Sequence, residues 1–410
     1  MRALVYGIPR AIPAAAPASL DDPAVATILA QPFGLHDLDQ PVVGSDEGVV
    51  IAPRLVGICG SDARLMLGDL SEGDMDNPMA SFSQLPFVPG HEVVADVVEA
   101  GPSSGFEPGE RVVLNPWMSC APRGLVPCAS CRQGNLAQCE RFLDAGIGPG
   151  LHIGVTAGAP GAFAERLAVH GSQLHRVAPG VGDAAAVLAD PFSVSLHAIM
   201  RRPPPPDGRA LVIGQGALGT TAVAVLRRWH PNVAVGVVTR FDHQAAAAAR
   251  LGGDLVVAHE PRAQTLESLA SWSQADLHPS LVGLPMSYPG GVDVVYDTVG
   301  SAETLELAVR IVKVRGDIVL LGVATPRRFE WTPIYFKELT VTGSSGFGVE
   351  SIDGHRAHAI DHYLATCEQG LDLSWLVTHV APLERWLELC VSLAEPARSG
   401  VIKAAFTPNG

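Results

Sequence analysis

The sequence has little charge, few aromatic residues and no long apolar run. Of its 410 residues, 17% are charged and 6% are aromatic, whereas 47% are hydrophobic, which is the balance of a folded globular protein with a large core. No run of about 18 apolar residues is free of glycine, proline or charge, so no membrane-spanning helix is expected. Basic residues are also scarce, and the net charge of −14 argues against nucleic acids and anionic membranes as partners.

Disulfide bonds are also not expected. There are seven cysteines, and four of them lie between Cys120 and Cys139, which is typical of metal ligation in a reducing compartment. The N-terminal residues Met1–Tyr6 are too short for the apolar core of a secretory signal and instead predict a strand. The proline-bearing segment after them is expected to be a surface insertion. We therefore expect a cytoplasmic enzyme.

The chain is too long for one compact domain, so two domains are expected. Two different patterns of apolar residues along the sequence indicate where they lie. Residues 1–190 combine many glycines and prolines with short apolar runs, which predicts an irregular β-rich domain. Residues 191–342 alternate apolar runs with helix-like stretches, which predicts βαβ units and a doubly wound parallel sheet. Residues 343–410 are expected to return to the first domain.

The expected elements follow from these runs. Strands of the first domain are expected at Met1–Tyr6, Gly48–Ile51, Val93–Val98 and Arg111–Leu114. Strands of the second domain are expected at Ala210–Ile213, Val233–Val238, Leu255–Val257, Val292–Tyr296 and Ile318–Leu321. Helices are expected at Gly219–Trp229, Gln244–Leu251, Ala302–Val312 and Leu383–Ala394, and a last strand at Val401–Phe406.

Two glycine-flanked segments carry side chains that zinc prefers. Gly57–Asp62 contains Cys59, and Gly90–Glu92 contains His91. A catalytic zinc takes three protein ligands and keeps one open position. The hydroxyl of Ser61 follows closely enough to take a proton from an oxygen on such a metal. A buried cysteine that only packs is the alternative for the first segment.

Two further motifs lie downstream. One is a group of four cysteines, at Cys120, Cys128, Cys131 and Cys139. The other is the sequence Gly-Gln-Gly-Ala-Leu-Gly at Gly214–Gly219, which directly follows the apolar run Ala210–Ile213. A glycine pattern that follows a strand and opens a helix is typical of dinucleotide binding.

The order of these motifs resembles the zinc-dependent medium-chain alcohol dehydrogenases, over about Met1–Phe406. The resemblance implies a GroES-like catalytic domain at 1–190 and 343–410, with a structural zinc lobe at 116–142. It also implies a Rossmann domain at 191–342 that binds the dinucleotide. The family forms homodimers or homotetramers through the Rossmann domains, so an edge strand near Leu339–Thr342 is expected to pair with its twin.

The resemblance assigns roles around the catalytic zinc. Cys59 and His91 correspond to the first two ligands and Asp190 to the third. Glu92 is expected to close the fourth position when substrate is absent, and Asp62 to hold His91 in one tautomer. Because Asp190 precedes a proline, a turn or helix-start role is the alternative for it.

The proton route departs from the family pattern. The better-known members have a relay histidine where this chain has Arg64. The proton is therefore expected to leave through Ser61 and then through a cofactor ribose hydroxyl and water. The segment Leu65–Leu85 is expected to shape the pocket entrance. Three residues are expected to form an apolar substrate pocket: Trp117, Met118 and Phe192.

The cysteine group matches the structural zinc site in part. Cys128, Cys131 and Cys139 have the spacing of the last three ligands, but position 125, where the family has the first, is Leu125. Cys120 is the candidate for the missing ligand, since the chain between ligands can vary while the tetrahedral geometry is kept. A lobe that retains cysteines without metal is the alternative.

The glycine motif implies a nicotinamide cofactor. Gly214 permits a tight turn, Gly216 lets the backbone approach the pyrophosphate and Gly219 lets the helix pack on the strand. The helix N-terminus at Ala217 and Leu218 offers amide donors to the phosphates.

The second strand of the Rossmann domain favours NADP over NAD. Thr239 and Arg240 stand where an acidic residue would bind the ribose 2′-hydroxyl of NAD, and a hydroxyl beside a guanidinium suits a phosphate. Asp242 would favour NAD if the turn were tighter. Turns after two further strands are expected to border the nicotinamide, at Thr298, Gly300, Gly322 and Val323.

These motifs predict a zinc enzyme that interconverts an alcohol and an aldehyde or ketone with NADP(H) or NAD(H). A polyol-, sugar- or formaldehyde-type dehydrogenase that uses NAD is the alternative within the superfamily. A non-catalytic NADPH-binding protein is the alternative from another class.

Overall fold

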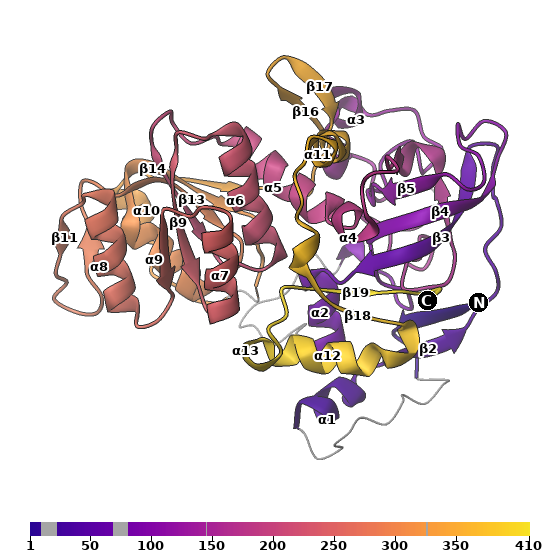
Figure 1. Cartoon of the computed structure of the whole chain (residues 1–410), viewed down its shortest axis with the longest axis horizontal. Helices are drawn as coiled ribbons and strands as arrows, with labels where there is room; N and C mark the ends of the chain where they lie inside the picture. Colours follow the sequence, from indigo (N-terminus) through magenta and orange to yellow (C-terminus); the bar gives the residue numbers. More distant parts are fainter. Residues whose placement is uncertain (10–22, 69–80, 145, 325–326) are drawn as a thin grey trace. The chain divides into compact units, whose positions relative to one another are not determined.

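The computed structural model describes residues 1–9, 23–68, 81–144, 146–324 and 327–410, which fall into two compact units (Figure 1). The first unit takes its described residues from 1–70, 77–190 and 347–410, and the second from 191–346. A β-rich unit accompanied by a parallel-sheet unit confirms the predicted fold class. Among the described helices, none has the length and apolar character needed to cross a membrane.

The first unit is built on a seven-stranded sheet. Its order is β18-β19-β3-β4-β5-β7, with β6 also paired to β3, while β1 and β2 form a separate antiparallel pair. The strands are β1 Arg2–Tyr6, β2 Phe33–Asp37, β3 Gly48–Gly57, β4 Glu92–Ala100, β5 Arg111–Leu114, β6 Leu167–His170, β7 Leu174–Arg176, β16 Val349–Ile352, β17 His355–His358, β18 Val377–Ala381 and β19 Lys403–Phe406. The helices are α1 Pro23–Ala30, α2 Gly60–Leu67, α3 Ala129–Gln133, α4 Asp183–Ala186, α11 Ala359–Glu368, α12 Trp386–Ala394 and α13 Pro396–Ser399.

Segments distant in sequence close this first unit. Strand β19 pairs with β3, so that Phe406 lies opposite Val56. Its apolar core joins β1, β3, β4 and the C-terminal α12, and the ring of Trp386 meets that of Phe33 edge-on at 5.2 Å. The last 64 residues are therefore part of the unit that carries the metal-ligand candidates, and two of their strands join its sheet.

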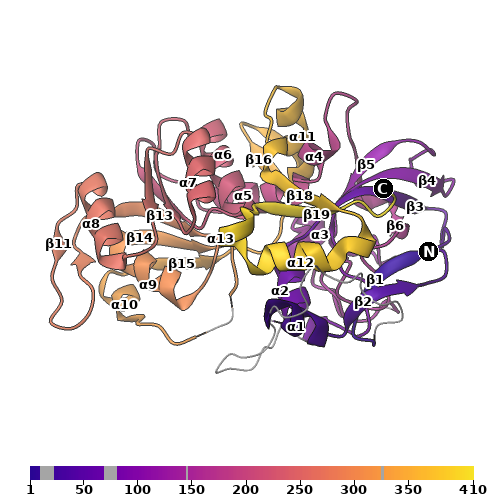
Figure 2. The same cartoon turned by 60° about the horizontal axis from the view of Figure 1, so that its bottom comes forward.

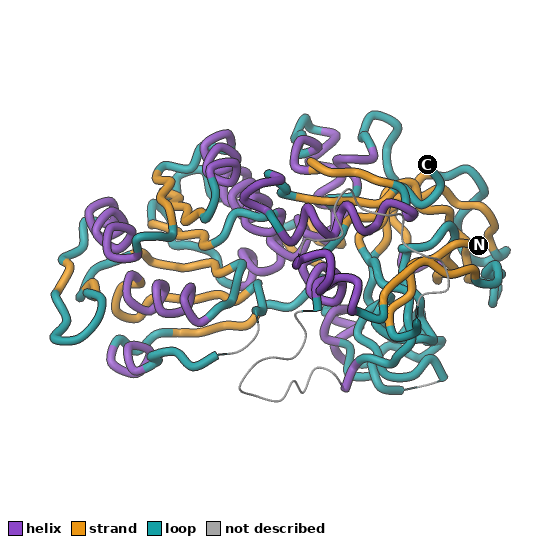
Figure 3. The backbone as a smooth tube through the Cα atoms, turned by 90° about the horizontal axis from the view of Figure 1, so that it is seen from below, coloured by secondary structure: helices purple, strands orange, loops and turns teal. Residues whose placement is uncertain are grey.

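The second unit is a parallel six-stranded sheet in the order β10-β9-β8-β13-β14-β15. Helices α6 and α7 lie on one face and α9 and α10 on the other (Figure 2), and the strands run side by side between them (Figure 3). The strands are β8 Arg209–Ile213, β9 Ala234–Thr239, β10 Leu255–Ala258, β11 Leu277–His278, β12 Met286–Ser287, β13 Val292–Asp297, β14 Val312–Leu320 and β15 Thr340–Gly343. The helices are α6 Ala217–Trp229, α7 Asp242–Arg250, α8 Arg262–Ser273, α9 Ala302–Ile311 and α10 Thr332–Phe336, and α5 Ala189–Arg201 opens the unit.

Strand β14 differs most from its predicted bounds. It begins at Val312, six residues before the predicted Ile318. Its first half carries polar side chains, and Lys313 pairs with Asp293 of β13, so the apolar pattern did not reveal it. Arg315 has a φ of 58°, which interrupts the pairing before the regular half of the strand.

Candidate metal centre and cofactor site

Three ligand candidates converge where strands β3 and β4 meet. The ligand atoms of Cys59, His91 and Glu92 all lie within 4.8 Å of one another. Gly57, the last residue of β3, is paired with Glu92, the first residue of β4, so the ends of the two strands place the three side chains together. One thiolate, one imidazole and one carboxylate are a donor set that zinc accepts.

Asp62 orders both ligand-bearing segments from a buried position. Its carboxylate accepts the backbone N–H of Cys59 at 3.0 Å and that of Gly90 at 3.3 Å. Oδ2 lies 3.8 Å from Nδ1 of His91, which is beyond hydrogen-bonding distance, and Nδ1 is buried without a hydrogen-bond partner. The expected hydrogen bond to His91 is therefore not formed, and Asp62 acts through the backbone beside each ligand. Burial raises the pKa of Asp62.

Glu92 is ion-paired with a lysine that the sequence analysis did not identify. Lys403 of β19 pairs with the Glu92 carboxylate, and both side chains are almost completely buried. Lys403 also donates to the carbonyl of Ile58 at 3.0 Å. Gly57 leaves the room for this pair, because a Cβ there would lie 2.2 Å from Glu92 Oε2. A lone lysine inside the apolar strand Val401–Phe406 was the available signal, since buried lysines are rare unless paired.

Asp190 lies close to this group but outside it. It is buried in the first turn of α5, and its ligand atoms are not among those within 4.8 Å of one another. Burial raises the pKa of Asp190 to about 7, and the charge of His91 opposes that rise. The first unit therefore offers two carboxylates, Glu92 and Asp190, for the third ligand position.

The ring of His152 packs against His91, and Trp117 packs against His152 in turn. The ring centroid of His152 lies 4.6 Å from that of His91, and Trp117 meets His152 edge-on at 5.7 Å. Burial lowers the pKa of His152 to about 3, which keeps the ring neutral. His152 was not identified from the sequence, because only a backbone bridge to Trp117 brings it here.

The other predicted pocket residues have different surroundings. Met118 is buried in the core of the first unit. Phe192 packs against Trp229 of α6 at 6.0 Å, so it contributes to the core of the second unit. Most of the predicted entrance segment Leu65–Leu85 lies outside the described residues, as does most of the predicted insertion after Tyr6.

Helix α2 carries the predicted proton carrier. Ser61 is exposed in its first turn, two residues after Cys59, and Arg64 lies on the same helix. The helix begins directly after Cys59 and ends at Gly68, which adopts a φ of 76°. The exposed hydroxyl is compatible with the predicted role in proton transfer.

The four cysteines form a compact group. Their sulfur atoms all lie within 4.8 Å of one another, with Sγ of Cys139 3.6 Å from Cys120 and 4.0 Å from Cys128. Backbone N–H groups of Cys128, Cys131 and Arg141 point at sulfur atoms of the group, at 3.3–3.4 Å. Burial raises the pKa of Cys128, but hydrogen bonds from the backbone of Cys131 and Glu140 lower it to about 6. Four sulfurs in this arrangement fit one tetrahedral zinc ion.

The loop that separates Cys120 from the other three folds back on itself. The N–H groups of Arg123 and Leu125 both donate to the carbonyl of Cys120, at 3.2 and 2.9 Å. Gly124 adopts a φ of 66°, which favours glycine. This tight turn absorbs the extra residues, so Cys120 reaches the group despite its distance in sequence.

The glycine motif has the geometry of a phosphate-binding turn. Gly214 has a φ of 90°, and a Cβ at Gly219 would lie 2.0 Å from the Gly214 carbonyl oxygen. A Cβ at Gly216 would meet nothing within 4 Å, so this face of the turn, next to Ala217 and Leu218 at the start of α6, is open. The two predicted nicotinamide turns lie against each other, because a Cβ at Gly300 would be 2.0 Å from the carbonyl oxygen of Gly322. Thr298 and Val323 flank these glycines, and Val323 is exposed.

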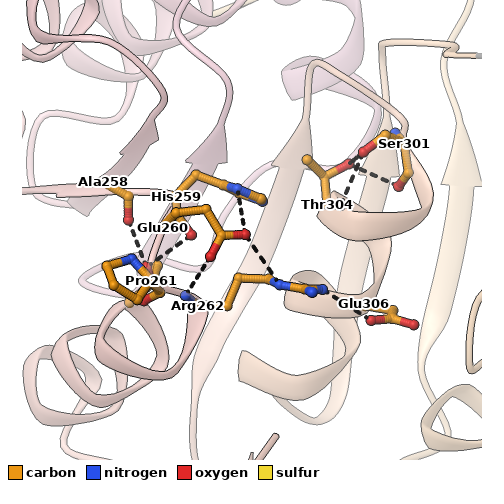
Figure 4. A network of polar contacts seen from close by, with 9 residues as sticks. Ala258, His259, Glu260, Pro261, Arg262, Ser301, Thr304 and Glu306 are labelled. Atoms are coloured by element: carbon orange, nitrogen blue, oxygen red, sulfur yellow. Dashed lines mark hydrogen bonds and ion pairs between the residues drawn. The ribbon is translucent and has the colours of Figure 1, made fainter. Parts of the chain in front are cut away.

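Arg240 is the exposed residue at the end of β9. Thr239 is buried and its hydroxyl donates to Val257, whereas Arg240 extends beyond the strand and Asp242 opens α7. His259 follows the neighbouring β10, and its backbone N–H donates to the carbonyl of Thr239 at 2.7 Å. The carboxylate of Glu260 lies between the imidazole of His259 and the guanidinium of Arg262 (Figure 4). Burial lowers the pKa of His259. The carboxyl ends of β9 and β10 thus carry two arginines, of which Arg262 already has carboxylate partners.

Comparisons with known proteins agree with both units. Residues 45–179 match the model of the alcohol dehydrogenase GroES-like domain, and residues 217–359 match that of zinc-binding dehydrogenases. An L-threonine 3-dehydrogenase of Anaeromyxobacter sp. (strain K) is 27% identical over 84% of this chain and 87% of its own length. D-arabinitol dehydrogenase 1 of Uromyces fabae is 25% identical over 92% of this chain and 94% of its own length. The crystal structure of 2R,3R-butanediol dehydrogenase from Bacillus subtilis superposes with a TM-score of 0.68 at 22% identity, covering 92% of this chain and 96% of that one, which shows a shared fold.

Proposed function

Because the chain belongs to the zinc-dependent medium-chain dehydrogenase family, we propose that it oxidises an alcohol reversibly to an aldehyde or ketone by hydride transfer to NADP. The observation that carries this proposal is the convergence of Cys59, His91 and a buried carboxylate beside the exposed hydroxyl of Ser61. A second group of four cysteines supports a separate structural zinc ion.

Cys59 and His91 would hold the catalytic zinc together with Asp190, while Lys403 neutralises Glu92. Bound zinc supplies positive charge that lowers the pKa of an alcohol, and bound nicotinamide accepts or donates the hydride. Asp62 fixes the backbone of both ligand segments. Ser61 would carry the hydroxyl proton away, and the neutral ring of His152 packs against His91 without adding charge.

For the substrate we propose a secondary alcohol with a neighbouring hydroxyl or amino group. The relatives named for threonine and arabinitol support this class. A polyol- or sugar-type activity with NAD is the second candidate, because the arabinitol relative covers almost the whole chain. A cytoplasmic location is proposed from the seven cysteines, which are all free thiols.

A substrate panel tests the proposal. Simple alcohols, vicinal diols, β-hydroxy amino acids, polyols and formaldehyde would each be supplied with NADP and with NAD, and cofactor reduction followed by absorbance. Turnover of the diol or amino alcohol members with NADP is the expected result. Absence of turnover across the panel, in protein that native mass spectrometry shows to hold two zinc ions, would favour a non-catalytic NADPH-binding protein.

Replacing Arg240 with alanine is expected to raise the KM for NADP about tenfold and to leave the KM for NAD unchanged. The expected loss is about 1.4 kcal/mol, the usual scale of one charge-assisted contact to a phosphate that NAD lacks. Steady-state kinetics with both cofactors is the measurement. The control is Arg250→Ala at the far end of α7, where neither KM should change. Equal effects on both cofactors would contradict selection by Arg240.

We also propose that two copies of the chain associate through the edge of the parallel sheet. β15 ends the sheet, and among the described residues no strand pairs with its outer side. Val341 of β15 is 40% exposed, and Tyr335 and Phe336 of the preceding α10 are each 73% exposed. An unpaired edge beside exposed aromatic rings suits a self-complementary interface.

Changing Tyr335 and Phe336 together to glutamate is expected to convert the oligomer to monomer, because four charges would then face one another across a two-fold interface. Light scattering after size-exclusion chromatography gives the mass in solution. Val126→Glu, an equally exposed position in the first unit, is the control and should leave the mass unchanged. A double variant of unaltered mass would exclude this edge as the interface.

A further inference from the structure

A single buried arginine connects the cysteine group to the surroundings of His91. The guanidinium of Arg123 donates to four backbone carbonyls, those of Met118 at 2.9 Å, Asp144 at 2.7 Å, Gly148 at 3.1 Å and Gly150 at 2.8 Å. The residue is 6% exposed, and all four of these hydrogen bonds go to backbone carbonyls and none to a carboxylate. Only the planar, five-donor guanidinium can serve so many acceptors at once.

Two of these carbonyls belong to the chain segments that carry Trp117 and His152. The N–H of Met118 donates to the carbonyl of Leu151, and the N–H of Ile153 donates to that of Pro116, each at 3.0 Å. This short antiparallel pairing places Trp117 opposite His152. Arg123 therefore holds both paired segments, one through the carbonyl of Met118 and the other through the carbonyl of Gly150. The second segment carries His152, whose imidazole packs against His91.

The position of Arg123 is set in turn by the cysteine group. It lies in the turn between Cys120 and Cys128, where its N–H donates to the carbonyl of Cys120. Four thiolates and one Zn²⁺ would together carry a charge of −2, which would help to compensate the buried guanidinium. Burial lowers the pKa of Arg123, and the charges of Cys139, Asp144 and Cys120 oppose this shift, so two sulfurs of the group and the Asp144 carboxylate all act on the guanidinium.

We propose that Arg123 is a positioning residue that links the four-cysteine zinc site to the catalytic metal centre. A zinc ion held by the four cysteines would order the turn after Cys120. The hydrogen bonds of Arg123 to the carbonyls of Met118 and Gly150 would then hold the segment that carries His152 in place. The inference rests on the proposed function for its catalytic consequence alone. Loss of Arg123 loosens His152 beside His91, so substrate binding weakens while the catalytic zinc remains.

Hydrogen–deuterium exchange on the full-length zinc-loaded protein tests the link independently of activity. In Arg123→Met, the amides of Met118 and Ile153 are expected to exchange at least tenfold faster than in the wild type, while those of β3 and β4 are unchanged. Arg123→Lys should give a smaller increase, since a lysine can satisfy fewer carbonyls. The matched control is Arg132→Met, which replaces an exposed arginine of the same lobe that donates to the Pro127 carbonyl at 2.6 Å.

Zinc content and kinetics complete the experiment. Arg123→Met is expected to lose one of two zinc ions on brief chelation, and to raise KM for the alcohol at least tenfold with a smaller change in kcat. If that variant does not fold, Cys128→Ser tests the same link from the metal side, with faster exchange at Met118 and Ile153 expected. Unchanged exchange at these amides in the tested variant, or equal changes in Arg132→Met, would overturn the proposal. Absence of turnover in every form, with the exchange difference present, would count against the proposed function and not against the link.

Discussion

Replacing Cys59 with serine is expected to remove one zinc ion per chain and to lower kcat/KM by about 10³-fold or more. A serine hydroxyl stays protonated at neutral pH, so it cannot supply the negative soft donor that zinc binds. Loss of the metal removes several kcal/mol of charge stabilisation at the reacting oxygen, and each 1.4 kcal/mol is about tenfold in rate. Native mass spectrometry would give the zinc count, and initial rates would give the loss of activity.

The control for this substitution is Cys367→Ser. Cys367 is half-buried on α11 and lies outside both cysteine-containing metal groups, so two zinc ions and full activity are expected. Asp190→Asn and Glu92→Gln then show which carboxylate is the third ligand, because substitution of the ligand should reduce zinc retention far more than substitution of the other carboxylate. A Cys59→Ser protein that retains two ions would exclude this cysteine as a ligand.

The second large effect is expected at Lys403. Replacing it with methionine should lower the free energy of unfolding by about 3–5 kcal/mol, because a buried Glu92 carboxylate is left without its cation. Lys403 also donates to the Ile58 carbonyl, next to Cys59, so that acceptor loses its partner as well. Denaturant titration of the zinc-free protein measures the change without a contribution from metal affinity.

Two comparisons isolate the buried pair. Adding Glu92→Gln to Lys403→Met should recover a large part of the lost stability, because a neutral amide costs less to bury than a carboxylate. Lys313→Met, which breaks the half-exposed pair with Asp293, should cost no more than about 1 kcal/mol. If Lys403→Met were as mild as Lys313→Met, the buried pair would not contribute as described.

Much of the fold could be predicted because its signals are local. Apolar runs located β5 without error and β8, β9, β10 and β13 to within a residue at either end. The start of β14 was missed because polar side chains face its partner strand there. The hairpin β16–β17 and helices α2 and α11 were also not predicted, since their apolar residues alternate less regularly with polar ones.

The site divides in a similar way. Cys59, His91 and the four cysteines were identifiable because ligand chemistry restricts residue type and spacing within a short segment. The glycine motif was identifiable because its backbone conformation admits few other residues, as Gly214 and Gly219 show. Each of these signals lies within a short segment and does not depend on the tertiary contacts of that segment.

The sequence by itself therefore determined the family, the two kinds of domain and the residue types that could bind zinc and dinucleotide. Tertiary structure alone decided that Lys403 neutralises Glu92, that His152 packs on His91, and that Arg123 bridges four carbonyls. Those contacts join residues far apart in the chain, and nothing in a local pattern fixes which buried polar groups will meet. They form because a charged or polar group that is buried in the core needs a hydrogen-bonding or ionic partner, and only the folded chain decides which groups lie close enough to be that partner.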